Sequence, residues 1–428
     1  MSDWRKNTRV FYGWWLVAAL FAVLFNTGGT GFYVFPVFIA PLQEEFGWTM
    51  TQISISAAIW AIFFGFSSPV VGWLIARYGA RKTMLTAAVL ASLTNLGLAG
   101  LQNLWMLYGV NLIAGFVVAG TTLVPIQTLV TNWFNKYRGR AMALAMTGIG
   151  AGGFLLPPFN EFLIRLWGWR LTWAFTCIIL WLVVIPLIAI FVRTRPSDVG
   201  LMSDGAVPGE EAGGETKAVM SGLPVKRAVS SLTFWMLLSV FFLQLVCMSA
   251  MNFHFVPFAT QEARFSSQQA AFFYGLAIGF SIAGRLLFGW MADRWRPERL
   301  MAIAAVLLAS GPIIIETLIV RAGIDNVNLL WFYAVPYGIG IGGQAIILPI
   351  LVGRCFGELN FSKIQGLVMA TFPLGITVGI PGAGRVFDIT GSYELVFITS
   401  FVGLAVSALL VLFVRSERYR AEFVKDSS

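Results

Sequence analysis

Long apolar runs dominate this chain and limit what it can fold into. Each of twelve runs holds about 20 or more residues, enough to cross about 30 Å of hydrocarbon as a helix. We expect spans at roughly 11–40, 52–76, 83–101, 105–132, 141–165, 169–193, 232–260, 268–292, 299–321, 328–354, 364–388 and 393–415. Only 11% of the residues are charged, whereas a soluble chain carries about 25%. The chain is therefore expected to be an all-α membrane protein, and an ordinary soluble enzyme is excluded.

One long polar stretch separates the sixth span from the seventh. It is rich in proline, glycine and glutamate, a composition typical of a linker. We therefore predict an N-terminal six-helix bundle over residues 1–193, a cytoplasmic linker over 194–231, and a C-terminal six-helix bundle with a cytoplasmic tail over 232–428.

Short motifs recur in the two halves. The sequence Gly-Trp-Leu-Ile-Ala-Arg at 72–77 ends the second span, and Gly-Trp-Met-Ala-Asp-Arg at 289–294 ends the eighth. The fifth and eleventh spans each contain a G-x-x-x-G pair, namely Gly148/Gly152 and Gly375/Gly379. Such pairs let helix backbones approach closely in lipid, and repeated halves are typical of secondary transporters.

Basic residues lie mainly in alternate loops. If both termini and the even-numbered loops share one side, that side receives about 23 of the 29 Lys and Arg residues. This asymmetry predicts that both termini are cytoplasmic. It also explains the net charge of +9 as a topology signal, so we expect a lipid bilayer and not nucleic acid as the partner.

The residues at 72–82, Gly-Trp-Leu-Ile-Ala-Arg-Tyr-Gly-Ala-Arg-Lys, resemble the cytoplasmic loop signature of the major facilitator superfamily. The usual Asp of that signature is Ala76 here, while the second copy keeps it as Asp293. The resemblance covers the whole chain. It implies the major facilitator fold, two pseudo-symmetric six-helix bundles, and a cytoplasmic gate in which we include Arg77, Arg81, Asp293 and Arg294.

Three segments resemble bacterial members of the monocarboxylate transporter and oxalate–formate antiporter group. They are Phe-Tyr-Gly-Trp-Trp-Leu-Val at 11–17, Trp-Phe-Asn-Lys-Tyr-Arg-Gly-Arg-Ala-Met-Ala-Leu-Ala-Met-Thr-Gly at 133–148, and Gly-Trp-Arg at 168–170. This resemblance implies a small organic anion as substrate, usually with one carboxylate and often moved together with a proton. We expect a monomer in the inner (plasma) membrane.

Arg285 is the leading candidate for substrate binding. It lies eight residues before Asp293, hence about 12 Å into the eighth span. An ionised side chain there costs at least about 2.5–3.5 kcal/mol, and guanidinium forks onto a carboxylate. The alternatives are a structural pair with a membrane acid or snorkelling toward the cytoplasm. The resemblance favours binding, since the family carries a functional Arg in this helix.

The chain departs from animal members of that family at two ionisable positions. An Asp one turn before the Arg is Ser281 here, and a Lys after a Phe-Pro pair in the first span is Val37. Both residues are linked to proton coupling in the family, so antiport with a second carboxylate stays open.

His254 is the only histidine, and histidine changes charge near neutral pH. We consider it as the proton carrier or as a hydrogen-bond partner that gates the substrate, with a hydrogen-bonded interfacial residue as the equal alternative. Three acids near outer span ends, Glu161, Glu316 and Asp388, are expected to be interfacial.

We expect a substrate cavity lined by polar and aromatic side chains. The candidates are residues that share one face of a span, or that lie on the spans that line the cavity in the superfamily. Tyrosine and amide groups can orient a carboxylate while the rings pack an apolar tail; helix–helix hydrogen bonds are the alternative. The candidate substrate-binding residues are Arg285, Tyr33, Asn26, Gln127, Tyr274, Tyr333, Tyr337, Gln344, Ser281 and Asn252.

These observations predict a secondary active transporter of a monocarboxylate or similar small organic anion, driven by proton symport through alternating access. The alternatives are a carboxylate antiporter, an efflux pump for apolar compounds, and a non-transporting membrane receptor or scaffold. No nucleophile–base pair, metal set or Walker motif is apparent, so we expect no enzyme activity and no cofactor.

Overall fold

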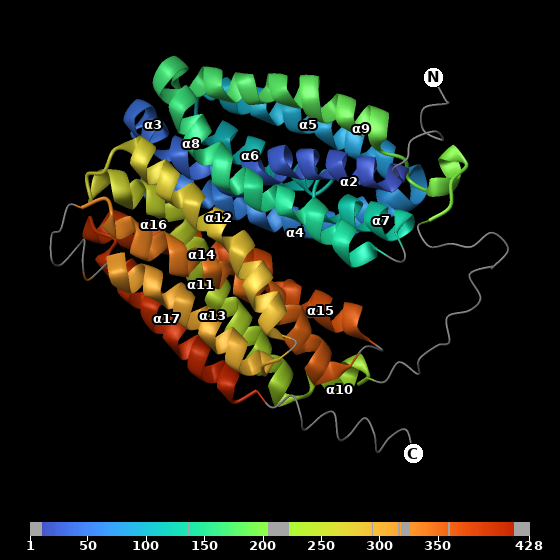
Figure 1. Ribbon diagram of the computed structural model, residues 1–428. Coiled ribbons are helices and arrows are strands. Elements are labelled where there is room, and N and C mark those ends of the chain that lie inside the picture. Colours follow the sequence, from blue (N-terminus) through green and yellow to red (C-terminus); the bar gives the residue numbers. More distant parts are fainter. Residues whose placement is uncertain are drawn as a thin grey trace. The chain divides into compact units, whose positions relative to one another are not determined.

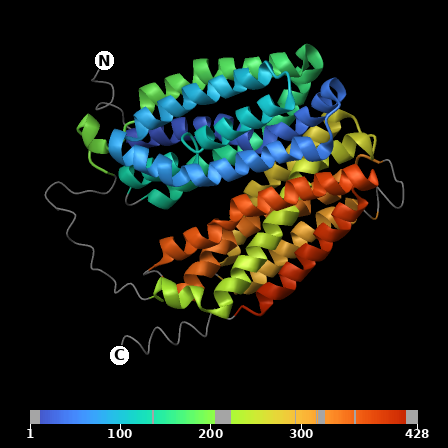
Figure 2. The same cartoon turned by 180° about the vertical axis from the view of Figure 1, so that it is seen from behind.

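The computed structural model describes residues 11–134, 137–203, 222–292, 294–315, 317, 326–357 and 360–414 (Figures 1 and 2). In the first half the helical elements are α2 (Tyr12–Val23), η1 (Leu24–Gly28), η2 (Thr30–Val34), η3 (Phe35–Phe38), α3 (Ile39–Phe46), α4 (Met50–Tyr78), α5 (Ala80–Ala99), α6 (Leu104–Val118), α7 (Leu123–Trp133), α8 (Arg138–Ile179), η4 (Leu180–Val184), α9 (Ile185–Phe191) and η5 (Pro196–Val199). In the second half they are α10 (Val225–Val229), α11 (Leu232–Gln261), α12 (Ser267–Ala292), α13 (Pro297–Ile314), α14 (Leu329–Phe356), α15 (Phe361–Met369), α16 (Thr371–Thr390) and α17 (Glu394–Leu412).

The number of membrane spans follows from one bent segment. By length and composition, 11 helical segments of the described chain could cross a membrane, and the longest, Gly139–Phe191, has 53 residues. That is more than twice what a bilayer needs. The segment bends at Gly168, whose φ of +79° is accessible to glycine at little cost. It therefore holds two spans, which agrees with twelve spans, and the predicted all-α class is confirmed.

The chain divides into two compact units. Unit 1 is Met1–Pro41 with Ile59–Gly214, and unit 2 is Leu42–Ala58 with Glu215–Ser428. Helix α4 therefore belongs to both, because its first nine residues are part of unit 2. The predicted boundaries at 193 and 232 stay a prediction, and residues 204–221 of the linker lie outside the described part.

Three spans of unit 1 are irregular in mid-course, and the sixth is one of them, since it contains the π-helical segment η4. The first span changes from α-helix to the π-helical segments η1 and η2 and then to the 3-10 segment η3. The fourth span is broken between α6 and α7, where Thr122 has φ −112° and ψ −120°. A Cβ on Gly31 of η2 would lie 3.1 Å from the Val118 side chain at the end of α6. The irregular stretches of the first and fourth spans are therefore neighbours.

The G-x-x-x-G pairs do bring helix backbones together. In unit 1, a Cβ on Gly148 would meet the carbonyl oxygen of Phe21, and one on Gly152 would meet that of Phe25. Any larger residue at these positions in α8 would separate it from the first span.

The same packing recurs in unit 2. A Cβ on Gly375 would meet Leu245, and one on Gly379 would meet the Val246 carbonyl and the Ser249 hydroxyl of α11. Ser249 Oγ also lies 3.3 Å from the Gly375 carbonyl oxygen, to which it donates. The sequence repeat thus corresponds to a repeated helix contact, between α8 and the first span and between α16 and α11.

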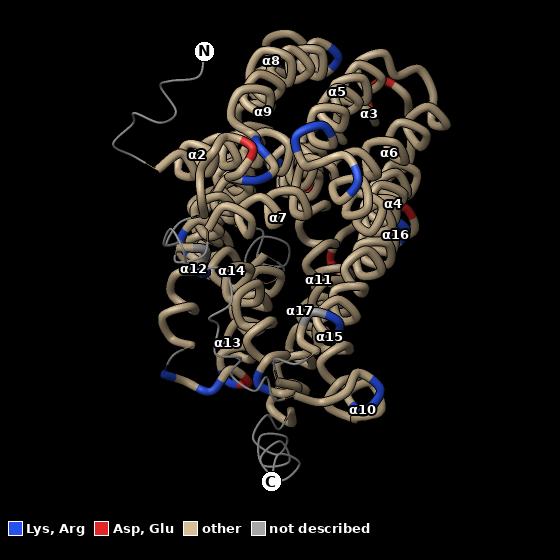
Figure 3. Tube along the Cα trace, turned by 90° about the vertical axis from the view of Figure 1, so that its right-hand side faces the viewer, with Lys and Arg blue, Asp and Glu red and all other residues tan. Residues whose placement is uncertain are grey.

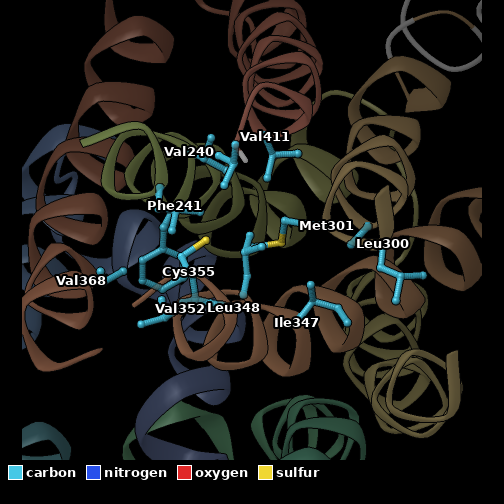
Figure 4. Close-up of a cluster of buried hydrophobic side chains, with 14 of the residues drawn as sticks. Val240, Phe241, Leu300, Met301, Ile347, Leu348, Val352, Cys355, Val368 and Val411 are labelled. Atoms are coloured by element: carbon cyan, nitrogen blue, oxygen red, sulfur yellow. The ribbon is translucent and has the colours of Figure 1, made fainter. Parts of the chain in front are cut away.

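Unit 2 has a well-packed apolar core at the end of its helices near α10 and α15. Figure 4 shows Phe241, Met301, Leu348 and Cys355 converging from α11, α13 and α14, all with little or no exposure. Charged residues occupy few positions along the described chain, as Figure 3 shows. The helices are therefore held mainly by packing, and a charge within a span requires a reason.

We predict that Gly379→Ala destabilises the protein by about 1–3 kcal/mol, because the added methyl overpacks the contact with α11. Gly382→Ala in the same helix is the matched control, since its Cβ would have nothing within 4 Å and the gain in helix propensity is equal. The measurement is the thermal unfolding midpoint in detergent. Equal midpoints for the two variants would contradict the close contact.

Candidate functional site

Arg285 lies at the edge of the contact between α12 and α14. A Cβ on Gly342 of α14 would lie 2.6 Å from the Arg285 amide nitrogen and would also meet the Ser281 carbonyl oxygen. Glycine at this position lets the two helices pack directly backbone to backbone. The Arg285 side chain is half-buried, and its Nε is buried without a hydrogen-bond partner among the described residues.

The Nε of Arg285 is thus a buried donor within a span that no described residue satisfies. A buried donor left unpaired costs about 1–3 kcal/mol, and more when it is charged. Ser281, one turn earlier, forms no hydrogen bond with this nitrogen, and its Oγ donates to the Ile278 carbonyl at 2.6 Å. A ligand carboxylate would supply the missing acceptor in the fork geometry that guanidinium prefers.

Tyr274, Tyr333, Tyr337 and Asn252 form a second group, the aromatic cluster, together with Phe255. The Tyr333 ring stacks on Phe255 with centroids 4.4 Å apart and on Tyr337 at 5.1 Å. Tyr337 Oη donates to Asn252 Oδ1 at 3.1 Å, and all three tyrosines are at most 1% exposed. The structure thus brings these predicted residues together in the interior of unit 2.

On α14, the residues of the aromatic cluster and the glycine that contacts Arg285 lie on different faces of the helix. Tyr337 packs on Gly311 of α13, and Gln344, seven residues further along α14, is on the same stripe. Gly342, which faces α12, is about 200° from Gln344 around the helix. The contacts of α14 therefore do not join Gln344 or the cluster to Arg285.

Two further buried donors of this stripe have no partner among the described residues. They are the Tyr333 hydroxyl, in a side chain with 0% exposure, and Gln344 Nε2, in a side chain with 4% exposure. Together with Arg285 Nε, three of the predicted binding residues hold unsatisfied donors.

The predicted residues of unit 1 lie in or near the irregular spans. Asn26 is in η1 and is 9% exposed, Tyr33 is in η2 and is half-buried, and Gln127 is exposed on α7. Backbone that departs from the α-helix within a span is common where a site is built. The sequence placed these residues on regular helices, and nothing in its apolar pattern indicates the π-helical turns.

His254 is buried at 1% exposure near the end of α11. Its Nδ1 is 3.1 Å from Tyr393 Oη, its Nε2 is 2.9 Å from the Ile380 carbonyl oxygen, and Ser54 Oγ lies 3.5 Å from Nε2. A neutral imidazole protonated on Nε2 satisfies both main contacts, with the tyrosine as donor to Nδ1. Protonation of Nδ1 would require the tyrosine hydroxyl to turn and accept.

Of the three acids expected at interfaces, only two lie in the described part, and Glu316 does not. Glu161 is 4% exposed within α8, so it is more buried than its position near the span end suggested.

The predicted gate residues that the structure describes contact residues of their own half of the chain. Arg77 Cζ lies 5.5 Å from the Trp73 ring, and Arg294 Cζ lies 4.3 Å from the Trp290 ring, each one turn away. Arg81 Nη2 donates to the Ala189 carbonyl at 2.6 Å. Asp293 lies outside the described residues, so its role stays a prediction.

Sequence reasoning missed a carboxylate beyond the end of α11. Glu262 accepts hydrogen bonds from the Tyr393 amide at 2.7 Å and from Ser392 Oγ at 3.1 Å. Its burial raises the pKa of the Glu262 carboxyl, which these two hydrogen bonds oppose. Burial also raises the pKa of the Tyr393 phenol well above 10, so this tyrosine stays a neutral partner for His254.

Comparisons with known proteins agree with this architecture. The sequence profile described as Major Facilitator Superfamily matches residues 16–351. Human monocarboxylate transporter 11 is 28% identical over 91% of this chain and 80% of its own length. An uncharacterised MFS-type transporter of Bacillus subtilis, YcxA, is 24% identical over 95% of this chain and 97% of its own length.

Solved structures with the same fold include a bacterial homologue of the human lysosomal transporter Spinster. In its inward-facing and occupied conformation it superposes with a TM-score of 0.69 at 15% identity, over 94% of each chain. At this identity the likeness establishes the fold alone.

We predict opposite effects for two neighbouring tyrosines of the aromatic cluster. Tyr337→Phe should destabilise the protein by about 0.5–1.5 kcal/mol, because Asn252 loses its donor. Tyr333→Phe should leave the thermal midpoint unchanged or raise it, because it removes an unsatisfied hydroxyl. The two variants are matched in ring burial and stacking. A larger loss for Tyr333→Phe would mean that its hydroxyl is already satisfied.

Proposed function

Because this chain belongs to the Major Facilitator Superfamily, we propose that it is a secondary active transporter of a monocarboxylate or similar small organic anion, with Arg285 as the residue that holds the carboxylate. Membrane transport, rather than enzyme activity, is the function common to its named relatives. Alternating access supplies the mechanism expected of a two-bundle transporter.

The observation that carries this proposal is the Nε of Arg285, a buried donor within a span that no described residue satisfies. A charged donor at that depth is costly unless a ligand or partner satisfies it, and a carboxylate matches its geometry. The names of several relatives support the substrate class, since they are monocarboxylate transporters. Asn26, Tyr33 and Gln127 of unit 1 remain candidates for contacts with the rest of the substrate, as do Ser281, Gln344 and the aromatic cluster of unit 2.

We further propose that a proton accompanies the anion and that His254 carries it. The imidazole is buried in a site where both nitrogens already have partners, so a change in its protonation must rearrange the Tyr393 hydroxyl. Such a rearrangement would couple protonation of His254 to the contacts of α11 with α16 and with Tyr393.

Antiport is the second candidate, and one specific observation favours it. The position one turn before Arg285 is Ser281, which is fully buried and bonded to its own helix, so no acid there can exchange a proton with the site. A returning carboxylate would then neutralise Arg285 in place of the proton.

Arg285→Ala is expected to lower carboxylate uptake about 30-fold or more, because it removes the charged partner of a desolvated carboxylate. Arg285→Lys should lose less, since charge remains but the fork does not. Uptake is measured in proteoliposomes with a panel of radiolabelled monocarboxylates from acetate to phenylacetate. Arg299→Ala, an exposed residue in the first turn of α13, is the control. Unchanged uptake by Arg285→Ala would refute the binding role, and flux of apolar compounds alone would indicate efflux.

His254→Gln is expected to abolish the stimulation of uptake by an inward proton gradient while leaving carboxylate exchange in place. The glutamine stays neutral at every pH and can still bond to the Ile380 carbonyl. The measurement compares uptake with and without an imposed pH gradient. Stimulation that persists in the variant would exclude His254, and uptake that depends on internal carboxylate but not on the gradient would establish antiport.

A further inference from the structure

The first nine residues of α4 belong to unit 2, although the rest of the helix belongs to unit 1. Four backbone amides at the start of α4, those of Thr49 to Gln52, have no acceptor within the helix. Two of them, the amides of Thr49 and Gln52, are satisfied by nearby side chains. Thr49 and Gln52 form a capping box, in which the Thr49 amide donates to Gln52 Oε1 at 2.9 Å and the Gln52 amide donates to Thr49 Oγ1 at 3.2 Å. The Ile53 amide donates to the Thr49 carbonyl at 3.2 Å.

The two remaining amides are satisfied by one distant carboxylate. Asp388 Oδ1 accepts from the Met50 amide at 3.0 Å, and Asp388 Oδ2 accepts from the Thr51 amide at 2.8 Å. A helix begins with unpaired amides and a positive dipole end, so a carboxylate bonded through both oxygens is favourable there. Asp388 is 338 residues from Met50, and it lies in the last turn of α16.

The backbones of α16 and α4 meet one turn before Asp388. A Cβ on Gly384 would lie 2.7 Å from Ser54 Oγ and 3.1 Å from the Met50 carbonyl oxygen. Ser54 is 0% exposed, while the Asp388 side chain is exposed. Helices α16 and α4 therefore touch closely at Gly384. One turn later, the hydrogen bonds from the Met50 and Thr51 amides to the Asp388 carboxylate lie where water can reach them.

Neighbouring groups place this contact at one end of unit 2. Gln261 Nε2 donates to Gln43 Oε1 at 2.8 Å, next to the end of α11, and His254 is close to Ser54. The distribution of basic residues among the loops predicts that this end faces away from the cytoplasm. A transporter must open and close each end in turn, so contacts that hold helices together at one end must break when that end opens.

We propose that Asp388 is a positioning residue that holds the first turn of α4 on α16, and that release of this latch is what opens this end of the transporter. The latch consists of the Asp388 carboxylate and the Met50 and Thr51 amides. It needs no particular substrate, so its test is independent of the proposed monocarboxylate activity.

Hydrogen–deuterium exchange of the full-length protein in lipid nanodiscs tests the bond. Asp388→Ala is expected to raise the exchange rate of the Met50 and Thr51 amides about tenfold, since each loses a charged acceptor. Asp388→Asn should raise it less, because one side-chain oxygen can still accept. Glu262→Gln is the matched control, a carboxylate that caps Tyr393 at the same end and should leave residues 47–54 unchanged.

Thiol labelling tests the opening. Ser54→Cys should react slowly with a maleimide in the parent protein and about tenfold faster when combined with Asp388→Ala. The three native cysteines are buried, which keeps background labelling low. Faster exchange and faster labelling together support the latch. Unchanged exchange, an equal rise in Glu262→Gln, or faster exchange with unchanged labelling would each overturn it.

Discussion

Direct backbone contact between helices at glycine is the constraint on which the rest of the structure depends. Lipid offers no hydrophobic gain for pairing two apolar helices, so close packing has to supply much of the association energy. In unit 1 this contact joins α8 to the first span, and in unit 2 it joins α16 to α11 and α14 to α12. The position of Arg285 beside Gly342, and of Asp388 beside the first turn of α4, both follow from such contacts.

Much of this could be predicted from the sequence, because the relevant signals are local. Apolar runs give the spans, and the spacing of Gly148 from Gly152 gives a helix face that packs closely. The stripe of Tyr333 and Tyr337 also follows from helical phase. Helical phase does not reveal which helix each stripe of side chains faces. The stripe of Tyr333 and Tyr337 faces α11 and α13.

Other features leave no local signal. The π-helical turns around Asn26 pack against α8, and the apolar pattern of the first span is the same in either helix type. Asp388 was expected to be an ordinary interfacial acid, because its partners are backbone amides, which every residue has. A side-chain pattern cannot reveal a carboxylate that bonds to the main chain of a helix more than 300 residues away.

The contact between α12 and α14 has a mechanical consequence. Where two helices touch through glycine, no side chain lies between them to change rotamer or to yield, and protein interiors are nearly incompressible. The two helices are therefore expected to move as one rigid pair, because α12 cannot slide or tilt on α14 without breaking several contacts at once. Arg285 is part of this pair, so we expect its backbone to move together with α14 when the helices rearrange.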